Sequence, residues 1–297
     1  MALLDDITVA LLGEIAVRRD GALAAVPGAR ARLLVAALAI HPGRSRSAQS
    51  LIDEVWGEDP PRSPMNALHT QVSRLRSALP EGALEIGPAG YRLVLAPEQV
   101  DLTLAQLLEK QARQARAAGD GVACLEAVTA ARTLWRGEPA ADLPPGPVAE
   151  ELTTLAATRR RALDALELAA REAVGDLPAA IELAEQAVAA DPFDEPAHAT
   201  LMRLLATAGR TNEALDVFAT VRTRLVDQLG ADPGPALVAL NTAILRGEPL
   251  PGQPTARTAR GARPGLPAGS ANGAAAQSDS TAPPELTVVG PGTRPPD

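Results

Sequence analysis

The sequence from Ser63 to Leu79 reads SPMNALHTQVSRLRSAL. Serine followed by proline is typical of a helix start, with Ser63 as N-cap and Pro64 at the first helical position. Because each residue turns a helix by about 100°, four apolar side chains fall on one narrow stripe. They are Leu68, Val72, Leu75 and Leu79. The pattern predicts an amphipathic helix that packs by this stripe and ends near Pro80.

The other side of this helix is polar and has no carboxylate. Its residues are Asn66, His69, Thr70, Ser73, Arg74, Arg76 and Ser77. No acidic residue lies between Asp59 and Glu81 to pair with the arginines. Short hydrogen-bonding groups framed by arginines suit a helix in the DNA major groove, where they reach base edges and phosphates. The alternative interpretation is a solvated surface helix.

Working outward, we predict short strands over residues 7–26 and helices over Ala29–His41 and Ser47–Gly57. After the helix at Ser63, Leu84–Leu95 reads as two strands around a GPAG turn. Two adjacent helices followed by a hairpin describe a winged helix-turn-helix, in which the second helix enters the major groove and the hairpin contacts its flank. Arg92 lies on this hairpin, which we call the wing.

The charge distribution agrees with one basic surface. Residues 1–97 contain ten arginines and ten acids, whereas residues 98–297 carry the whole net charge of −8. The first part has two acid-free runs, and Arg44 and Arg46 lie in the first of them. A neutral domain can still present one positive face to phosphates, so both arginines are added to the predicted DNA contacts.

From Asp101 the pattern is entirely helical. The predicted helices are Asp101–Ala118, Val122–Arg136, Val148–Val174, Leu177–Ala190, Glu195–Ala208, Asn212–Leu229 and Pro235–Leu245. Residues such as Gly175 and Gly209, or Ala180 and Ala214, match at an offset of 34, the tetratricopeptide period. Coincidence in an alanine-rich sequence is the alternative for this alignment, although the helix pairs do not depend on it.

Composition divides the chain into three parts. We predict a DNA-binding domain at 1–97, a tetratricopeptide-like helical domain at 98–246 and a disordered tail at 247–297, where ten prolines and eight glycines interrupt any apolar period. In the tail, ELTVV (Glu285–Val289) could form a docking strand, an interpretation that we do not favour.

No membrane span or signal peptide is expected, and the single Cys124 excludes an intrachain disulfide, so a cytoplasmic protein is expected.

The sequence contains no pattern that is typical of a catalytic or metal-binding site. The three histidines have no cysteine or carboxylate at metal-ligand spacing, and the chain has no GxSxG or dinucleotide motif. We therefore expect no metal, no cofactor and no enzymatic activity. A basic run at Arg159–Arg161 reads as a solvated helix face, with contact to DNA or polymerase as the alternative.

These segments resemble the Streptomyces antibiotic regulatory protein (SARP) family. The stretch from RARLLVAALAIHPGR through VSRLRSAL to GYRL resembles its DNA-binding domain, which is similar to the effector domains of two-component response regulators. LWRGEPAADL, DPFDEPAHATLMRLL and LGADPGPAL resemble the bacterial transcriptional activator domain that follows it. The resemblance covers about Ile7 to Leu245.

The resemblance implies a transcription activator of a secondary-metabolite gene cluster, such as an antibiotic cluster. Members bind direct repeats in double-stranded promoter DNA as head-to-tail protomers, so a homodimer on DNA is expected, and they recruit RNA polymerase holoenzyme. By analogy with related winged helices, the loop before the recognition helix contacts polymerase. That loop comprises Glu58, Asp59, Pro60, Pro61 and Arg62. A plain connector is the alternative for it. The chain has no GxxxxGK[ST] run, which implies a small, ATP-independent member.

Two other functions remain open from the sequence. The chain could be a helical-repeat adaptor whose N-terminal domain does not bind DNA specifically, or a repressor with the same DNA-binding domain. Binding to direct-repeat DNA separates the first from an activator, and transcription in vitro separates the second.

Overall fold

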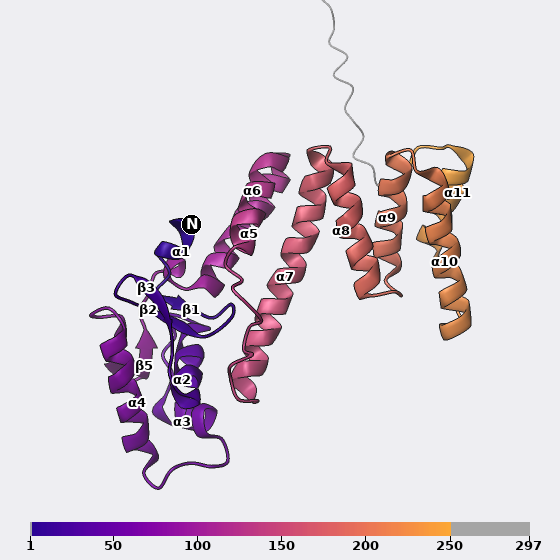
Figure 1. Cartoon of the computed structure of the whole chain (residues 1–297). Helices are drawn as coiled ribbons and strands as arrows, with labels where there is room; N and C mark the ends of the chain where they lie inside the picture. Colours follow the sequence, from indigo (N-terminus) through magenta and orange to yellow (C-terminus); the bar gives the residue numbers. More distant parts are fainter. Residues whose placement is uncertain (1, 251–297) are drawn as a thin grey trace, which may run out of the picture. The chain divides into compact units, whose positions relative to one another are not determined.

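The computed structural model describes residues 2–250, with side chains from Leu4 onward. Over this range a small sheet, three helices and a hairpin precede a long run of helices (Figure 1). The predicted mainly α fold with an N-terminal winged helix-turn-helix and a following helical domain is confirmed. Nearly all of the predicted tail, including ELTVV, lies outside the described residues. In residues 2–250 no helix is both long and apolar enough to cross a membrane.

The N-terminal sheet is antiparallel, in the order β1-β2-β3. After the short helix α1 (Ala2–Asp5), its strands are β1 (Val9–Ala10), β2 (Ala16–Arg19) and β3 (Ala22–Ala25). The tight turn between β2 and β3 consists of Asp20 and Gly21, with φ of 50° and 82°. Two successive positive φ values define the mirror-image turn that suits twisted hairpins, which is why the Asp-Gly pair occurs here.

Three helices and the wing complete the N-terminal part. They are α2 (Ala29–Ala39), α3 (Ala48–Trp56), α4 (Pro64–Ala78), β4 (Leu84–Gly87) and β5 (Gly90–Leu93). The predicted cap of α3 is confirmed, because Ser47 accepts a hydrogen bond from the Ser50 backbone N–H at 3.0 Å. Gly57, with φ of 56°, ends the helix as predicted.

The rest of the described chain is helical. After a short 3₁₀ turn (Pro97–Gln99) come α5 (Asp101–Ala117), α6 (Gly121–Arg132), α7 (Pro147–Ala173), α8 (Leu177–Ala190), α9 (Glu195–Thr207), α10 (Thr211–Leu229) and α11 (Pro235–Arg246). The prediction that α6 continues to Arg136 is wrong. The Arg136 backbone N–H donates to the Leu12 carbonyl at 2.8 Å, so this segment bonds to the N-terminal part and does not extend the helix.

The 34-residue repeat is supported by matching environments. Gly175 and Gly209 have φ of 80° and 78° in the turns before α8 and α10. Ala180 and Ala214, the matched alanines, are both fully buried. Because a left-handed turn and a close helix contact recur at the same offset, coincidence of composition does not explain the alignment.

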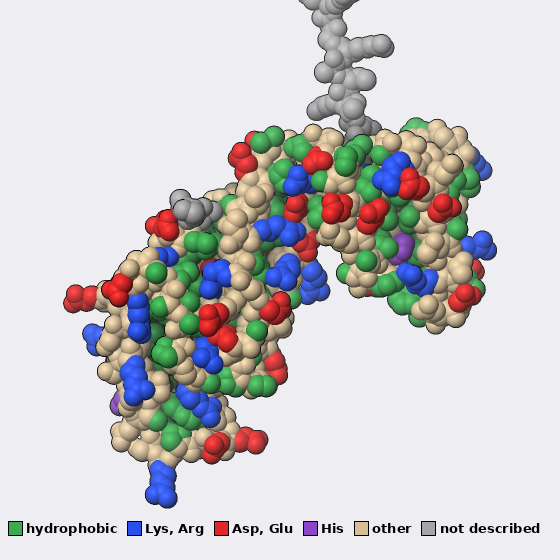
Figure 2. Space-filling model, viewed as in Figure 1, with side chains coloured by type: hydrophobic (Ala, Val, Ile, Leu, Met, Phe, Trp, Pro, Cys, Tyr) green, Lys and Arg blue, Asp and Glu red, His purple; other side chains and the backbone are tan. Residues whose placement is uncertain are grey.

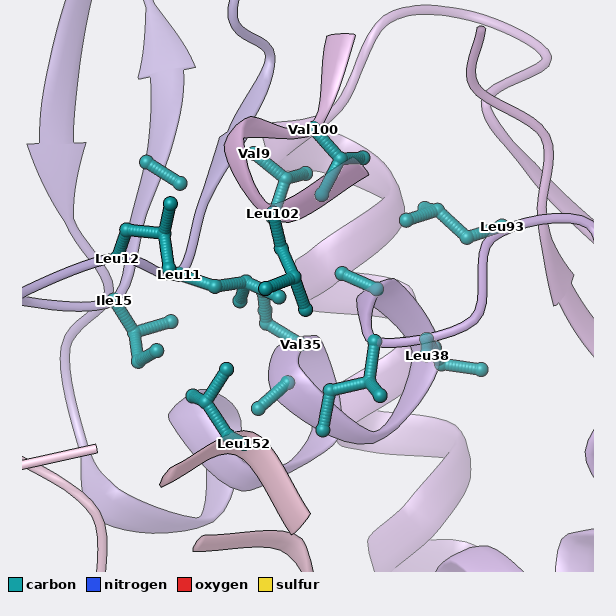
Figure 3. Close-up of a cluster of buried hydrophobic side chains, with 14 of the residues drawn as sticks. Val9, Leu11, Leu12, Ile15, Val35, Leu38, Leu93, Val100, Leu102 and Leu152 are labelled. Atoms are coloured by element: carbon teal, nitrogen blue, oxygen red, sulfur yellow. The ribbon is translucent and has the colours of Figure 1, made fainter. Parts of the chain in front are cut away.

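The hydrophobic core does not divide at residue 97. One cluster runs from Ile7 through the winged helix to Ala170 in α7, and a second covers α8 to α11. Figure 3 shows side chains of the first cluster that come from distant parts of the chain, including Leu11, Val35, Leu93 and Leu152. The winged helix therefore packs on the first helices of the following domain, and the boundary at residue 97 stays a prediction.

Asp101, at the start of α5, ties these two parts together. Its carboxylate is fully buried and accepts hydrogen bonds from the Leu11 backbone N–H at 2.8 Å and the Leu12 N–H at 2.9 Å. The Arg136 guanidinium lies 3.8 Å away. Burial raises the pKa of Asp101 from 3.8 to about 6, although these N–H groups and Arg136 oppose the shift.

The raised pKa makes a pH-dependent contribution to stability. Because the folded state binds the Asp101 proton more tightly than the unfolded chain, this contribution is lost as pH rises from about 4 through about 6. Relative to Asp101→Asn, which does not titrate, wild type should lose about 2 kcal/mol of unfolding free energy between pH 4.5 and pH 7. Urea unfolding of both proteins at the two pH values measures this. If the difference in unfolding free energy between wild type and Asp101→Asn is the same at both pH values, the proposed link between Asp101 protonation and stability is wrong.

Candidate DNA-binding surface

Helix α4 is held by the apolar stripe that its sequence predicts. Leu68, Val72 and Leu75 are buried against α2, α3 and the N-terminal sheet. Pro64 occupies the first turn as expected. Ser63 stands at the predicted N-cap position, but its side chain makes no capping hydrogen bond. The stripe fixes how α4 is rotated about its axis, and this rotation decides which residues face solvent.

All seven predicted contact residues of α4 are exposed: Asn66, His69, Thr70, Ser73, Arg74, Arg76 and Ser77. Two of the hydroxyls already donate within the helix, from Thr70 to the Asn66 carbonyl at 2.9 Å and from Ser77 to the Ser73 carbonyl at 3.1 Å. A hydroxyl has one donor hydrogen and two acceptor lone pairs. In this conformation Thr70 and Ser77 can therefore accept from a base amino group but not donate to a base.

The arginines of α4 and of the loop before it have no acidic partner among the described residues. Arg62, Arg74 and Arg76 are exposed, and none of them forms an ion pair in the described part of the chain. Figure 2 shows basic side chains spaced along the side of the molecule that carries α4. These positive charges are therefore not neutralised internally, as contact with phosphates requires.

The wing stands beside the C-terminal end of α4. A groove of about 570 Å³ separates them, lined by Arg76 on one side and Arg92 on the other. Arg92 is exposed and pairs across the hairpin with Glu85 at 2.5 Å. An exposed pair of this kind contributes little energy, so Arg92 can exchange Glu85 for a phosphate.

The other two predicted contacts differ from each other. Arg44 is exposed in the turn between α2 and α3. Arg46 is only 17 % exposed and pairs with Glu54, and its guanidinium also donates to the Ala37 carbonyl at 3.3 Å. Because its charge is neutralised internally, Arg46 has a structural role, and we remove it from the proposed DNA contacts.

Arg46 also anchors the wing through its backbone, which exchanges two 2.8 Å hydrogen bonds with Tyr91. Gly90 makes this approach possible. Its φ is +109°, and an added Cβ would lie 2.0 Å from the Arg46 carbonyl oxygen.

Gly90→Ala should therefore lower the free energy of unfolding by about 2 kcal/mol or more, because it adds both backbone strain and a backbone clash. Gly87→Ala, across the same hairpin turn, is the matched control, since an added Cβ there meets nothing within 4 Å. Urea unfolding compares the two variants. Equal unfolding free energies of Gly90→Ala and Gly87→Ala would show that the wing does not depend on the close approach of Gly90 to Arg46.

The remaining predicted residues are exposed or have partners. In the loop before α4, Glu58, Asp59, Pro60 and Arg62 are exposed and Pro61 is half-buried. Within the basic run on α7, Arg159 is 17 % exposed and pairs with Glu109 at 2.9 Å. Arg160 lies over the Trp135 ring. Arg159 is therefore held within the fold, whereas Arg160 and Arg161 are exposed to solvent.

The other polar residues singled out by the sequence have partners within the fold or are buried. His41 pairs with Glu151 at 2.9 Å, and buried His198 contacts the Asp194 carbonyl at 2.9 Å. Cys124 is fully buried. Across residues 2–250 no group of three His, Cys, Asp or Glu side chains is arranged to hold a metal ion.

Sequence reasoning missed the contacts between the winged helix and the helical domain. Asp101 and Asp142 belong to this set. The Arg32 guanidinium donates to the Asp142 carbonyl at 2.8 Å, and Asp142 also accepts from the Ile15 backbone N–H. These partners are about 90 to 127 residues apart in sequence, and no local pattern links them.

The fold and this surface define a winged-helix transcriptional regulator. Residues 27–93 match the family model "Transcriptional regulatory protein, C terminal", and residues 100–245 match "Bacterial transcriptional activator domain". The chain therefore belongs to the SARP family of transcriptional regulators, as its sequence motifs suggested.

Individual relatives agree with this assignment. The transcriptional regulator RedD of Streptomyces coelicolor is 32% identical over 84% of this chain and 73% of its own length. The regulatory protein AfsR of the same species is 37% identical over 84% of this chain, which spans about 25% of AfsR. The structure of Mycobacterium tuberculosis EmbR in complex with a low-affinity phosphopeptide matches with a TM-score of 0.73 and 31% identity, covering 82% of this chain and 66% of EmbR.

Proposed function

We propose that this protein is a sequence-specific DNA-binding activator that places α4 in the major groove of promoter DNA. The observation that supports this most strongly is the exposed face of α4, which presents small polar groups and unpaired arginines. Asn66, Thr70, Ser73 and Arg74 lie nearest the bases. His69, Arg76, Ser77, Arg44 and Arg92 lie toward the backbone.

The proposed assembly on DNA follows from the family. Protomers bind direct repeats about one helical turn apart, as a head-to-tail homodimer on the DNA. The exposed loop Glu58–Arg62 and the helical domain face RNA polymerase holoenzyme, and the regulated genes form a secondary-metabolite cluster. Under this proposal the protein acts in the cytoplasm, without cofactor or catalysis, and residues 1–97 and 98–246 are its DNA-binding and activator domains.

Selection from a random pool of DNA duplexes at about 150 mM salt tests the proposal. The full chain should enrich a motif that recurs at a spacing of about 10 base pairs. If no sequence is enriched, the chain is a helical-repeat adaptor and not a specific DNA-binding protein. Transcription in vitro from a promoter with the enriched motif then separates activation from repression.

A further inference from the structure

A small pocket lies on the side of α4 that faces the N-terminal sheet. It has a volume of about 100 Å³ and is bounded by β2, β3, α2 and α4; we call it the α4 pocket. Its inner wall is apolar and includes the buried Val17, Leu34 and Leu75. Ala24 and Ala78 also line it, and longer side chains at these positions would occupy the space.

Two arginines from different elements line the same pocket. Arg19 comes from β2 and Arg74 from α4, and both are exposed. No acidic residue lines the pocket. Neither guanidinium has an ion pair or a side-chain hydrogen bond in the described structure, so both are available to an anion.

We propose that the α4 pocket binds a small carboxylic acid with an apolar body. The guanidinium fork matches the two carboxylate oxygens, and the apolar wall takes the body of the molecule. A closed apolar cavity that holds a whole benzene ring measures about 150 Å³, so this pocket of about 100 Å³, which is open where Arg19 and Arg74 line it, takes a short alkyl chain or part of a small ring. An inorganic phosphate would gain nothing from the apolar wall, and a nucleotide would not fit.

The position of Arg74 gives this site a consequence for DNA binding. Four residues of α4 line the pocket, namely Gln71, Arg74, Leu75 and Ala78, and they form one stripe along the helix. Arg74 is the member of this stripe that also belongs to the proposed DNA face. A bound carboxylate therefore competes with DNA for the Arg74 guanidinium. This competition rests on the proposed function, whereas binding of the carboxylate does not.

Fluorine NMR of 4-fluorobenzoate with the full chain tests the site. We expect a saturable shift that hexanoate competes away, and at least tenfold weaker binding of the neutral 4-fluorobenzamide. Arg19→Gln should weaken 4-fluorobenzoate binding about tenfold, and Ala24→Leu should abolish it by filling the pocket. Both positions are exposed, so the variants should fold, and circular dichroism checks this.

The site would be overturned by no saturable binding, by equal binding of acid and amide, or by unchanged binding in both variants. Equal competition by inorganic phosphate would also overturn it, because the pocket would then be only an anion contact.

A second measurement tests the competition, with ionic strength held constant by chloride. Benzoate should lower DNA affinity in wild type at concentrations about tenfold lower than in Arg19→Gln, whose DNA affinity without benzoate should equal that of wild type. Carboxylate binding without this loss would overturn the competition alone. Absence of any DNA binding would instead contradict the proposed function and leave the NMR result standing.

Discussion

Replacing Asp101 by alanine should lower the free energy of unfolding by about 3–5 kcal/mol. The substitution leaves the backbone N–H groups of Leu11 and Leu12 without their carboxylate partner. It also removes the negative charge nearest to Arg136. Buried donors without a partner carry their full desolvation cost, which makes this loss larger than that of an ordinary helix cap.

Asp120→Ala provides the matched control. Asp120 is also an aspartate at a helix N-terminus, where it accepts from the Ala123 backbone N–H at 2.9 Å, but it is exposed. Its loss should cost about 1 kcal/mol. Urea denaturation at pH 7 compares both variants with wild type. If Asp101→Ala costs no more than Asp120→Ala, Asp101 does not hold the winged helix to the helical domain.

Replacing Arg74 by alanine should weaken binding to the preferred DNA site by about 1–3 kcal/mol and relax the choice of base at one position. Its place beside Ser73 and Thr70 on the exposed face favours a guanine contact. Arg76 lines the groove toward the wing, so Arg76→Ala should weaken binding evenly across sequences and reduce the salt dependence by about one phosphate.

Quantitative gel shifts on the preferred site and on single-base variants, at several salt concentrations, measure both effects. Arg222→Ala on α10 is the control, because Arg222 is exposed far along the chain from α4, and it should leave binding unchanged. Equal loss of specificity from Arg74→Ala and Arg76→Ala would refute the division of roles.

The sequence predicts the local structure well because local signals determine it. Helix ends fall within a few residues of the prediction where glycine or proline marks them, as at Gly57 and Pro64. The rotation of α4 is also predictable, since Leu68, Val72 and Leu75 repeat at helical spacing. This one periodicity correctly predicts every exposed residue of the candidate recognition face.

Contacts between distant segments could not be predicted in this way. Arg46 lies in an acid-free run of the sequence, yet α3 brings Glu54 back to its guanidinium. The end of α6 depends on the Leu12 carbonyl, and the burial of Asp101 depends on β1 and the turn after it. A single sequence does not reveal which segments meet, so these contacts and the α4 pocket emerged only from the structure.

The ratio of two binding affinities tests the central claim most directly. The full chain is titrated at about 150 mM salt against its selected direct-repeat site and against a scrambled duplex of equal length and composition. If α4 reads bases, the selected site should bind at least about 1,000-fold more tightly. Equal affinity for both duplexes would mean that the arginines hold only phosphates and that the polar face of α4 reads no sequence.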